Sequence, residues 1–234
     1  MNKTLFIGGT HGNEPIGVKA LESLEKTRDD FDWIVGNPRA LEKNKRFTDA
    51  DLNRSAPGML TGATYESRRA AELLSLAKKY DCVIDLHGTV QDCGLFVIIT
   101  NPTKENLELA TRFEIDRIVI WPAITPDLNG PLSEFFPVGL EIECGLKDDQ
   151  RTQKELERVL RDFLDGRGTN NKIKNKEIYE VCGELRGDPG VKLKEFEEVT
   201  ISGETFCPLL IGAYDDFYGV TCYKLKKRDP KSLL

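Results

Sequence analysis

Short apolar runs alternate with amphipathic segments through residues 1–165, and this alternation limits the possible folds more than any other feature of the chain. The runs are rich in Val, Ile and Leu, as buried strands are, whereas the segments between them space their apolar residues as helices do. The pattern predicts an α/β fold whose mostly parallel or mixed sheet carries helices on both faces. We expect strands at 4–7, 33–35, 82–86, 94–100, 117–121 and 138–144, and helices at 16–24, 65–79 and 148–164.

The composition and the apolar pattern of the sequence change after Leu164. A polar and basic stretch, DGRGTNNKIKNK, is followed by short apolar runs interrupted by Gly and Pro. Such runs are typical of short strands joined by turns. We therefore expect a main domain at 1–165, a linker at 166–176 and a small all-β domain at 177–234.

Composition narrows the choice of partners. The formal charge of −6 gives no field that would attract nucleic acid. No apolar run approaches the ~18 residues of a membrane helix, and the N-terminus has no secretory-signal pattern. We expect a cytoplasmic protein with a small-molecule ligand and no nucleic-acid or membrane partner; a homo-oligomer and a monomer both stay open. The six cysteines form no Cys-x-x-Cys pair, which favours free thiols.

Both histidines of the chain follow or end predicted strands. His11 and Glu14 lie in GGTHGNEP after the first strand, and His87 lies in VIDLHGT. The carboxyl ends of strands are where sites form in open α/β sheets, and two His with one Glu are a common ligand set for catalytic zinc. The alternative is a pair of hydrogen-bonded structural histidines, because His-x-x-Glu also arises by chance. Asp85 could orient His87 or form an unrelated pair.

A cationic cluster occupies KNKRFTDADLNRS. Arg46 and Arg54 carry planar guanidinium groups suited to carboxylates, and Asn53 beside them can bond a carboxylate or an amide. A solvated loop is the alternative interpretation, with Asp49 and Asp51 holding these cations in place of a ligand.

Two glutamates interrupt the apolar strand in PVGLEIECGL. Glu141 and Glu143 share one face of that strand because side chains alternate. Burying a carboxylate without a partner is costly, so each is either exposed at an edge or functional. A glutamate beside an activated water could take its proton and pass it to a leaving amine.

Five motifs in residues 8–89, GGTHGNE, GNPRA, RFTDADLNR, YESRRA and DLHGT, resemble in order and spacing the succinylglutamate desuccinylase/aspartoacylase family of zinc-dependent amidohydrolases. The resemblance implies a zinc carboxypeptidase-like fold and the hydrolysis of an N-acyl amino acid. It implies one Zn²⁺ per chain on His11, Glu14 and His87, a scissile carbonyl polarised by Arg46, and a substrate carboxylate held by Asn53 and Arg54.

The resemblance leaves the general base and the substrate open. Counting from PVG selects Glu141, whereas the family's Glu-x-Gly pattern selects Glu143, which we prefer because the turn after the glutamate should set its reach. Tyr218 is the nearest candidate for a tyrosine that the family contributes to the pocket, with Tyr214 and Tyr223 close by. The segment AITPDLNGPLSEFFPVG lacks the arginine with which aspartoacylases grip a second carboxylate. A zinc carboxypeptidase or amidase acting on small peptides is an alternative, as is a non-catalytic metal- or metabolite-binding relative.

Overall fold

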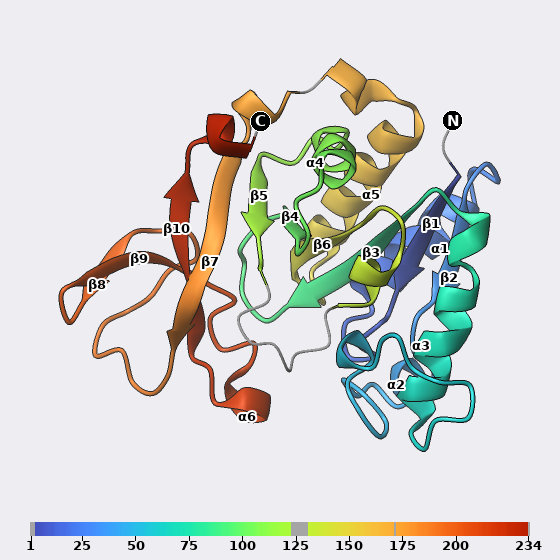
Figure 1. Cartoon of the computed structure of the whole chain (residues 1–234), viewed down its shortest axis with the longest axis horizontal. Helices are drawn as coiled ribbons and strands as arrows, with labels where there is room; N and C mark the ends of the chain where they lie inside the picture. The colour runs from blue at the N-terminus through green and yellow to red at the C-terminus, as the bar shows by residue number, and fades with distance from the viewer. Residues whose placement is uncertain (1–2, 123–130, 171, 234) are drawn as a thin grey trace.

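The computed structural model describes residues 3–122, 131–170 and 172–233, which form a ten-stranded sheet flanked by helices (Figure 1). The strand order is β2-β1-β3-β6-β4-β5-β7-β10-β9-β8. The strands of its first part are β1 (Thr4–Gly8), β2 (Asp32–Val35), β3 (Cys82–Thr89), β4 (Phe96–Ile99), β5 (Arg117–Ile120) and β6 (Gly139–Leu146). Each coincides with a strand expected from the sequence.

The sheet is mixed. β1 pairs in parallel with β2 and β3, and β3 pairs in parallel with β6. β4 enters antiparallel to β6 but runs parallel to β5. The parallel strands β1, β3 and β6 therefore end at one edge, where the loops after them come together.

Helices cover both faces, as the sequence predicts. One apolar cluster packs α1 (Ile16–Glu25), α4 (Lys104–Thr111) and α5 (Gln150–Leu164) against strand residues that include Phe6, Ile84 and Ile142. On the opposite face, α3 (Tyr65–Ser75) packs Ala70 and Leu73 against Leu5, Ile7 and Val83. These two layers hold the central strands in place. In the described part of the chain, no helix combines the length and the apolar character needed to cross a bilayer.

Strands make up most of the C-terminal part and extend the same sheet, and a short helix, α6 (Asp215–Tyr218), precedes the last strand. The strands are β7 (Glu177–Leu185), β8 (Val199–Ile201), β9 (Glu204–Leu209) and β10 (Cys222–Arg228). β7 pairs in parallel with β5, and β10, β9 and β8 follow in antiparallel order. The division into domains at 1–165 and 177–234 stays a prediction; two 3₁₀ turns, Arg167–Asn170 and Ile173–Asn175, lie in the stretch expected to link them.

Three details differ from the expected elements. The helix expected at 65–79 ends at Ser75, and a 3₁₀ turn follows at Ala77–Lys79. The short helix α2 (Pro38–Glu42) begins at Pro38, with the side chain of Asn37 accepting from the Ala40 N–H. The helix α4 begins after Thr103, whose side chain caps it. α2 and α4 were not expected from the sequence because helices this short show too few apolar repeats to be recognised.

Candidate metal centre

The loop between β1 and α1 carries His11 and Glu14 to the carboxyl edge of the sheet, where His87 lies near the end of β3. The loop turns at Gly9, whose φ of +69° lies in the left-handed region that favours glycine. Gly12 packs against the backbone of α2, so closely that a Cβ there would lie 2.0 Å from the carbonyl carbon of Ala40. Small residues therefore let the loop bend tightly between β1 and α1.

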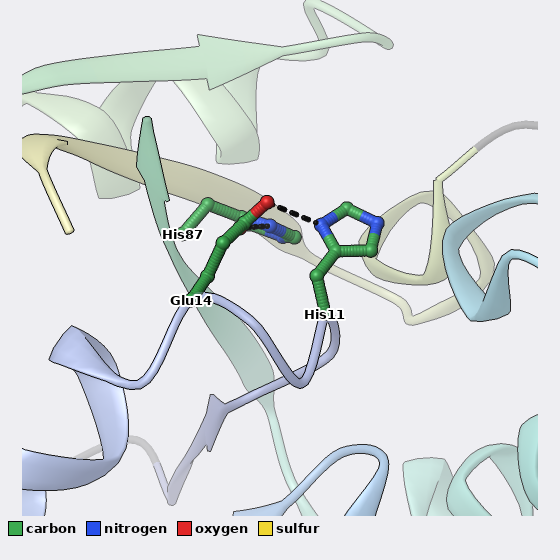
Figure 2. A group of neighbouring side chains, drawn as sticks. All are labelled: His11, Glu14 and His87. Carbon is green, nitrogen blue, oxygen red and sulfur yellow. Dashed lines mark hydrogen bonds and ion pairs between the residues drawn. The ribbon is translucent and has the colours of Figure 1, made fainter. Parts of the chain in front are cut away.

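The three side chains converge (Figure 2). The Nδ1 atom of His11 lies 3.0 Å from Oε1 of Glu14, and the Nδ1 atom of His87 lies 3.2 Å from its Oε2. One ligand atom from each of the three residues falls within a 4.8 Å span, and all three residues are buried. The structure thus brings together the three metal ligands that the sequence predicts.

The outer nitrogen of each imidazole also faces a carboxylate. His11 Nε2 is hydrogen-bonded to Oδ1 of Asp51 at 3.0 Å, and His87 Nε2 lies 3.1 Å from Oδ2 of Asp85. Asp85 in turn accepts the hydroxyl of Thr10. Carboxylates in these positions select the tautomer that leaves Nδ1 free to bind a metal. The sequence leaves open whether Asp85 orients His87 or forms an unrelated pair, and this contact favours the orienting role.

The charge of this cluster fits a divalent cation. The cluster contains the carboxyl groups of Glu14, Asp51, Asp85 and Glu141, which outnumber the two guanidinium groups of Arg46 and Arg54. Burial disfavours the imidazolium forms of His11 and His87, but the carboxylates outweigh burial and raise the pKa of both. A buried excess of negative charge is costly unless it is neutralised. Two imidazolium protons or one divalent metal ion would neutralise it, and the His₂Glu set suits Zn²⁺.

Arg46 lies against the cluster. Its Nη1 donates to Oε1 of Glu14 and its Nε to Oδ2 of Asp51, both at 3.2 Å. Aromatic rings of Tyr214 and Phe217 lie 5.1 and 5.6 Å from the guanidinium carbon, within cation–π range. Nη2 is buried and has no hydrogen-bond partner among the described residues. That nitrogen is free to donate to a ligand.

Asn53 and Arg54 lie next to Arg46 but are engaged with the protein. The Asn53 amide donates to Glu141 Oε1 at 2.7 Å and accepts the Leu132 N–H at 2.8 Å. Arg54 donates from Nη1 to the carbonyl oxygen of Asn53. Asn53 therefore holds Glu141 in place.

The two glutamates of β6 differ in their surroundings. Burial opposes ionisation of Glu141, but His87 and then Asn53 lower its pKa below the ordinary value, so this carboxylate is ionised and accepts a hydrogen bond from Asn53. Burial raises the pKa of Glu143 to about 8, with His87 opposing the rise and Glu14 adding to it. The Oε2 atom of Glu143 has no partner among the described residues.

A cavity of about 240 Å³ opens beside the cluster. Glu14, Arg46 and Glu143 lie in its wall, and so does Tyr214 from the C-terminal part of the chain. Tyr218, the tyrosine expected in the pocket, donates instead from its hydroxyl to Oδ2 of Asp51 at 3.3 Å. Tyr214 and Phe217 are thus the aromatic side chains among the described residues of the cavity wall. Asp51 contacts His11, Arg46 and Tyr218. The remaining wall residues are Asn13, Gly88, Thr89, Val90, Lys147, Leu210, Gly212, Ala213, Asp216 and Phe217.

Comparison with known proteins identifies the family. The family model of the succinylglutamate desuccinylase/aspartoacylase catalytic domain matches residues 1–164. The chain belongs to this family. A probable aspartoacylase of Prochlorococcus marinus subsp. pastoris is 30% identical over 192 residues, which cover 76% of this chain and 65% of that protein. A probable aspartoacylase of Trichodesmium erythraeum is 30% identical over 164 residues, 62% of this chain and 56% of the relative. The chain thus matches little more than half to two thirds of the length of these relatives.

Solved structures show the same fold. A point mutant of murine aminoacylase 3 superimposes with a TM-score of 0.77 at 20% identity, covering 97% of this chain and 94% of that chain. The succinylglutamate desuccinylase from Chromobacterium violaceum gives a TM-score of 0.71 at 17% identity, covering 97% and 85%. The mixed sheet with helices on both faces is therefore the fold of this family, as the sequence motifs implied.

Proposed function

We propose that this protein is a zinc-dependent hydrolase that cleaves the amide bond of an N-acyl amino acid. The observation that carries the proposal is the convergence of His11, Glu14 and His87 beside a cavity whose wall includes Arg46 and Glu143. Among the described residues, Nη2 of Arg46 and Oε2 of Glu143 have no hydrogen-bond partner. A purely structural cluster would leave no reason to bury an unused donor and an unused acceptor at one cavity.

His11, Glu14 and His87 would hold one Zn²⁺. When bound there, Zn²⁺ would act as a Lewis acid on the carbonyl group and lower the pKa of water. It would also replace the protons that the imidazoles otherwise need among their carboxylates. Asp51 and Asp85 would keep both rings oriented.

Arg46 and Glu143 perform the proton and charge chemistry. Nη2 of Arg46 donates to the carbonyl oxygen as negative charge develops on it. Glu143, in its ionised form, takes a proton from the attacking water and returns it to the amide nitrogen as the carbon–nitrogen bond breaks. Because burial raises its pKa to about 8, the positive charge of the Arg46 guanidinium and of a bound Zn²⁺ would favour that ionised form. The products are a carboxylate and a free amino acid. Arg54 binds the carboxylate of the amino-acid part, with Asn53 and Tyr218 beside it, and the ring of Tyr214 covers Arg46.

The test begins with metal content. Elemental analysis of the wild type and of His87→Ala should give about one zinc per chain in the wild type and a strong loss in the variant. The wild type is then assayed with N-acyl amino acids and with dipeptides. Release of free amino acid from the acyl substrates supports the proposal, while cleavage of dipeptides alone would assign a peptidase. Bound zinc without turnover of either class would contradict the proposed activity and favour a binding protein.

A further inference from the structure

The motif YESRRA, which begins α3, has no role in the proposed chemistry. Its glutamate, Glu66, is fully buried, with 0% of its surface exposed. No lysine or arginine pairs with it in the part of the chain that the structure describes. A buried carboxyl group without a cation is costly unless hydrogen bonds compensate for the lost water. The partners of Glu66 therefore indicate what this residue does.

Four hydrogen bonds converge on Glu66. Its Oε1 accepts the Thr48 N–H at 2.7 Å and the side-chain amide of Asn37 at 3.1 Å. Its Oε2 accepts the backbone N–H groups of Asp49 and Ala50, both at 3.1 Å. Three successive backbone N–H groups thus point at one carboxyl group, as they do around a bound anion. Every partner is a donor, so the position requires a side chain with two acceptor oxygens.

Other residues of α3 and of the loop add to this attachment. Oδ2 of Asp49 accepts the N–H of Tyr65, the first residue of α3, at 2.9 Å. Arg69 donates from Nη2 to the carbonyl oxygen of Val35 at 2.7 Å and from Nε to that of Gly36 at 2.8 Å. α3 therefore holds the end of β2 with a cation and the loop of residues 48–50 with an anion.

The loop that Glu66 holds leads directly into the candidate site. The last of the three N–H groups belongs to the residue before Asp51. Asp51 bonds Nε2 of His11 at 3.0 Å and accepts from Nε of Arg46 at 3.2 Å. The 3₁₀ turn Leu52–Arg54 follows and carries the residues that bind the substrate carboxylate in the proposed function. A small displacement of the loop would therefore reach both the metal ligand and the substrate-binding turn.

We propose that Glu66 is a positioning residue, whose carboxyl group holds residues 48–50 in the conformation that sets Asp51 against His11 and the turn Leu52–Arg54 toward the substrate. Glu66 acts through the loop, because among the described residues none of its hydrogen bonds reaches a candidate metal ligand. Its effect on substrate binding rests on the proposed function, whereas its effect on metal affinity through His11 does not.

The experiment replaces Glu66 with Gln, which has nearly the same shape but only one acceptor oxygen. In either orientation, its NH₂ group faces two of the four donors, so the loop must move. Three quantities are measured on the folded protein: the amide NMR signals of residues 48–54, the Kd for Zn²⁺, and the kinetics with an N-acyl amino acid. We expect shifted signals, a Kd raised by up to about tenfold, and KM raised about 10- to 100-fold, with a smaller change in kcat.

Glu105→Gln is the matched control. Glu105 is the second residue of α4, as Glu66 is of α3, and a threonine caps both helices. It is exposed, so the control removes the same charge from the same helical position without touching the loop. Its Kd for Zn²⁺ and its KM should equal those of the wild type.

A second variant tests the proposal should Glu66→Gln not fold. Asp49→Ala lies at an exposed loop position and removes the acceptor of the Tyr65 N–H. It should shift the same amide signals and raise the Kd for Zn²⁺ and KM by about 2- to 5-fold, an effect of one hydrogen bond at an exposed site.

The metal measurement separates this proposal from the proposed function. If the wild type hydrolyses no N-acyl amino acid, but Glu66→Gln weakens Zn²⁺ binding and Glu105→Gln does not, the proposed function fails and the positioning role stands. A folded Glu66→Gln protein with reduced stability but wild-type Kd and KM would overturn the proposal, because Glu66 would then be structural only. Wild-type Kd and KM in Asp49→Ala would overturn it if Glu66→Gln does not fold.

Discussion

Oδ1 of Asp51 lies 3.0 Å from Nε2 of His11, the ring nitrogen opposite the one that faces Glu14. The same carboxylate accepts from Nε of Arg46 and from the hydroxyl of Tyr218. Asp51 therefore orients a candidate metal ligand and a candidate catalytic cation at once.

Replacing Asp51 with Asn should weaken zinc binding about 10- to 100-fold, because partners of this kind set the tautomer and basicity of a metal-bound histidine. Competition with a chromogenic chelator measures the affinity. Asp29→Asn, an exposed position away from the centre, is the control and should bind zinc as the wild type does. Equal affinities in Asp51→Asn and the control would show that Asp51 has only a structural role.

Glu143 and Glu141 should respond differently to the same substitution. Glu143→Gln should reduce kcat by about 10²- to 10⁴-fold with zinc still bound, because the general base is lost. Glu141→Gln keeps an oxygen that can accept from Asn53, so its loss should be smaller. Steady-state kinetics with zinc content measured in parallel would decide between the two. An active Glu143→Gln beside an inactive Glu141→Gln would reverse the assignment.

Zinc affinity should rise with pH. Burial lowers the pKa of His11, but Glu14 and Asp51 raise it, so that the net pKa lies above the ordinary value of 6.5. Burial also lowers the pKa of His87, and Asp85 and Glu141 raise it well above 6.5. In the metal-free protein these imidazoles keep their protons to higher pH, and zinc must displace them. The Kd should therefore fall as the pH rises, by up to about tenfold per pH unit for each proton displaced, and level off once both rings are deprotonated. Equal Kd values at about pH 6 and pH 8 would contradict this mechanism.

Glu195 should control the part of the pocket contributed by the C-terminal segment. Its two carboxylate oxygens accept the backbone N–H groups of Leu210, at 2.9 Å, and Ile211, at 2.7 Å. These residues begin the segment that brings Tyr214 and Phe217 to Arg46. Gln offers only one acceptor oxygen, so Glu195→Gln should lower the free energy of unfolding by about 1 kcal/mol and raise KM several-fold. Thermal unfolding and kinetics measure both effects, and zinc content should stay the same. Glu197→Gln is the exposed control on the same loop.

The convergence of the three candidate metal ligands could be predicted from sequence because the information is local. His11 and Glu14 follow β1 and His87 lies near the end of β3, and parallel strands bring their carboxyl ends to one edge. The apolar periodicity predicts each strand of the sheet up to β6. The periodicity does not predict strand direction. Nothing in the apolar pattern of Phe96–Ile99 shows that this strand runs antiparallel to β6.

The supporting contacts could not be predicted in the same way because they join distant segments. Tyr214 reaches Arg46 across 168 positions of the sequence, and Tyr218 reaches Asp51 across 167. Sequence spacing offers three similar tyrosines and no means of ranking them. The partner of Asn53 is likewise set by the packing of β6 against the loop before α3, so its bond to Glu141 becomes visible only in three dimensions.

Gly12 should be essential for the metal centre for steric reasons alone. A Cβ at Gly12 would lie 2.0 Å from the carbonyl carbon of Ala40 and 2.2 Å from the nitrogen of Leu41, and both are backbone atoms that cannot rotate away. Gly12→Ala must therefore push the loop that carries His11 and Glu14 away from α2. We expect a loss of more than about 2 kcal/mol in the free energy of unfolding, within the range that overpacking produces, and zinc affinity reduced at least tenfold.

Gly183→Ala is the matched control for Gly12→Ala. Gly183 lies in β7, and a Cβ there would meet only a side-chain atom of Lys224 at 3.8 Å, an ordinary contact. Alanine should also be at least as favourable as glycine in a strand. Chemical denaturation of both variants, followed by zinc titration of the folded proteins, separates the two effects. A Gly12→Ala protein that is as stable as Gly183→Ala and binds zinc with wild-type affinity would show that the loop can move off α2 without disturbing His11 and Glu14.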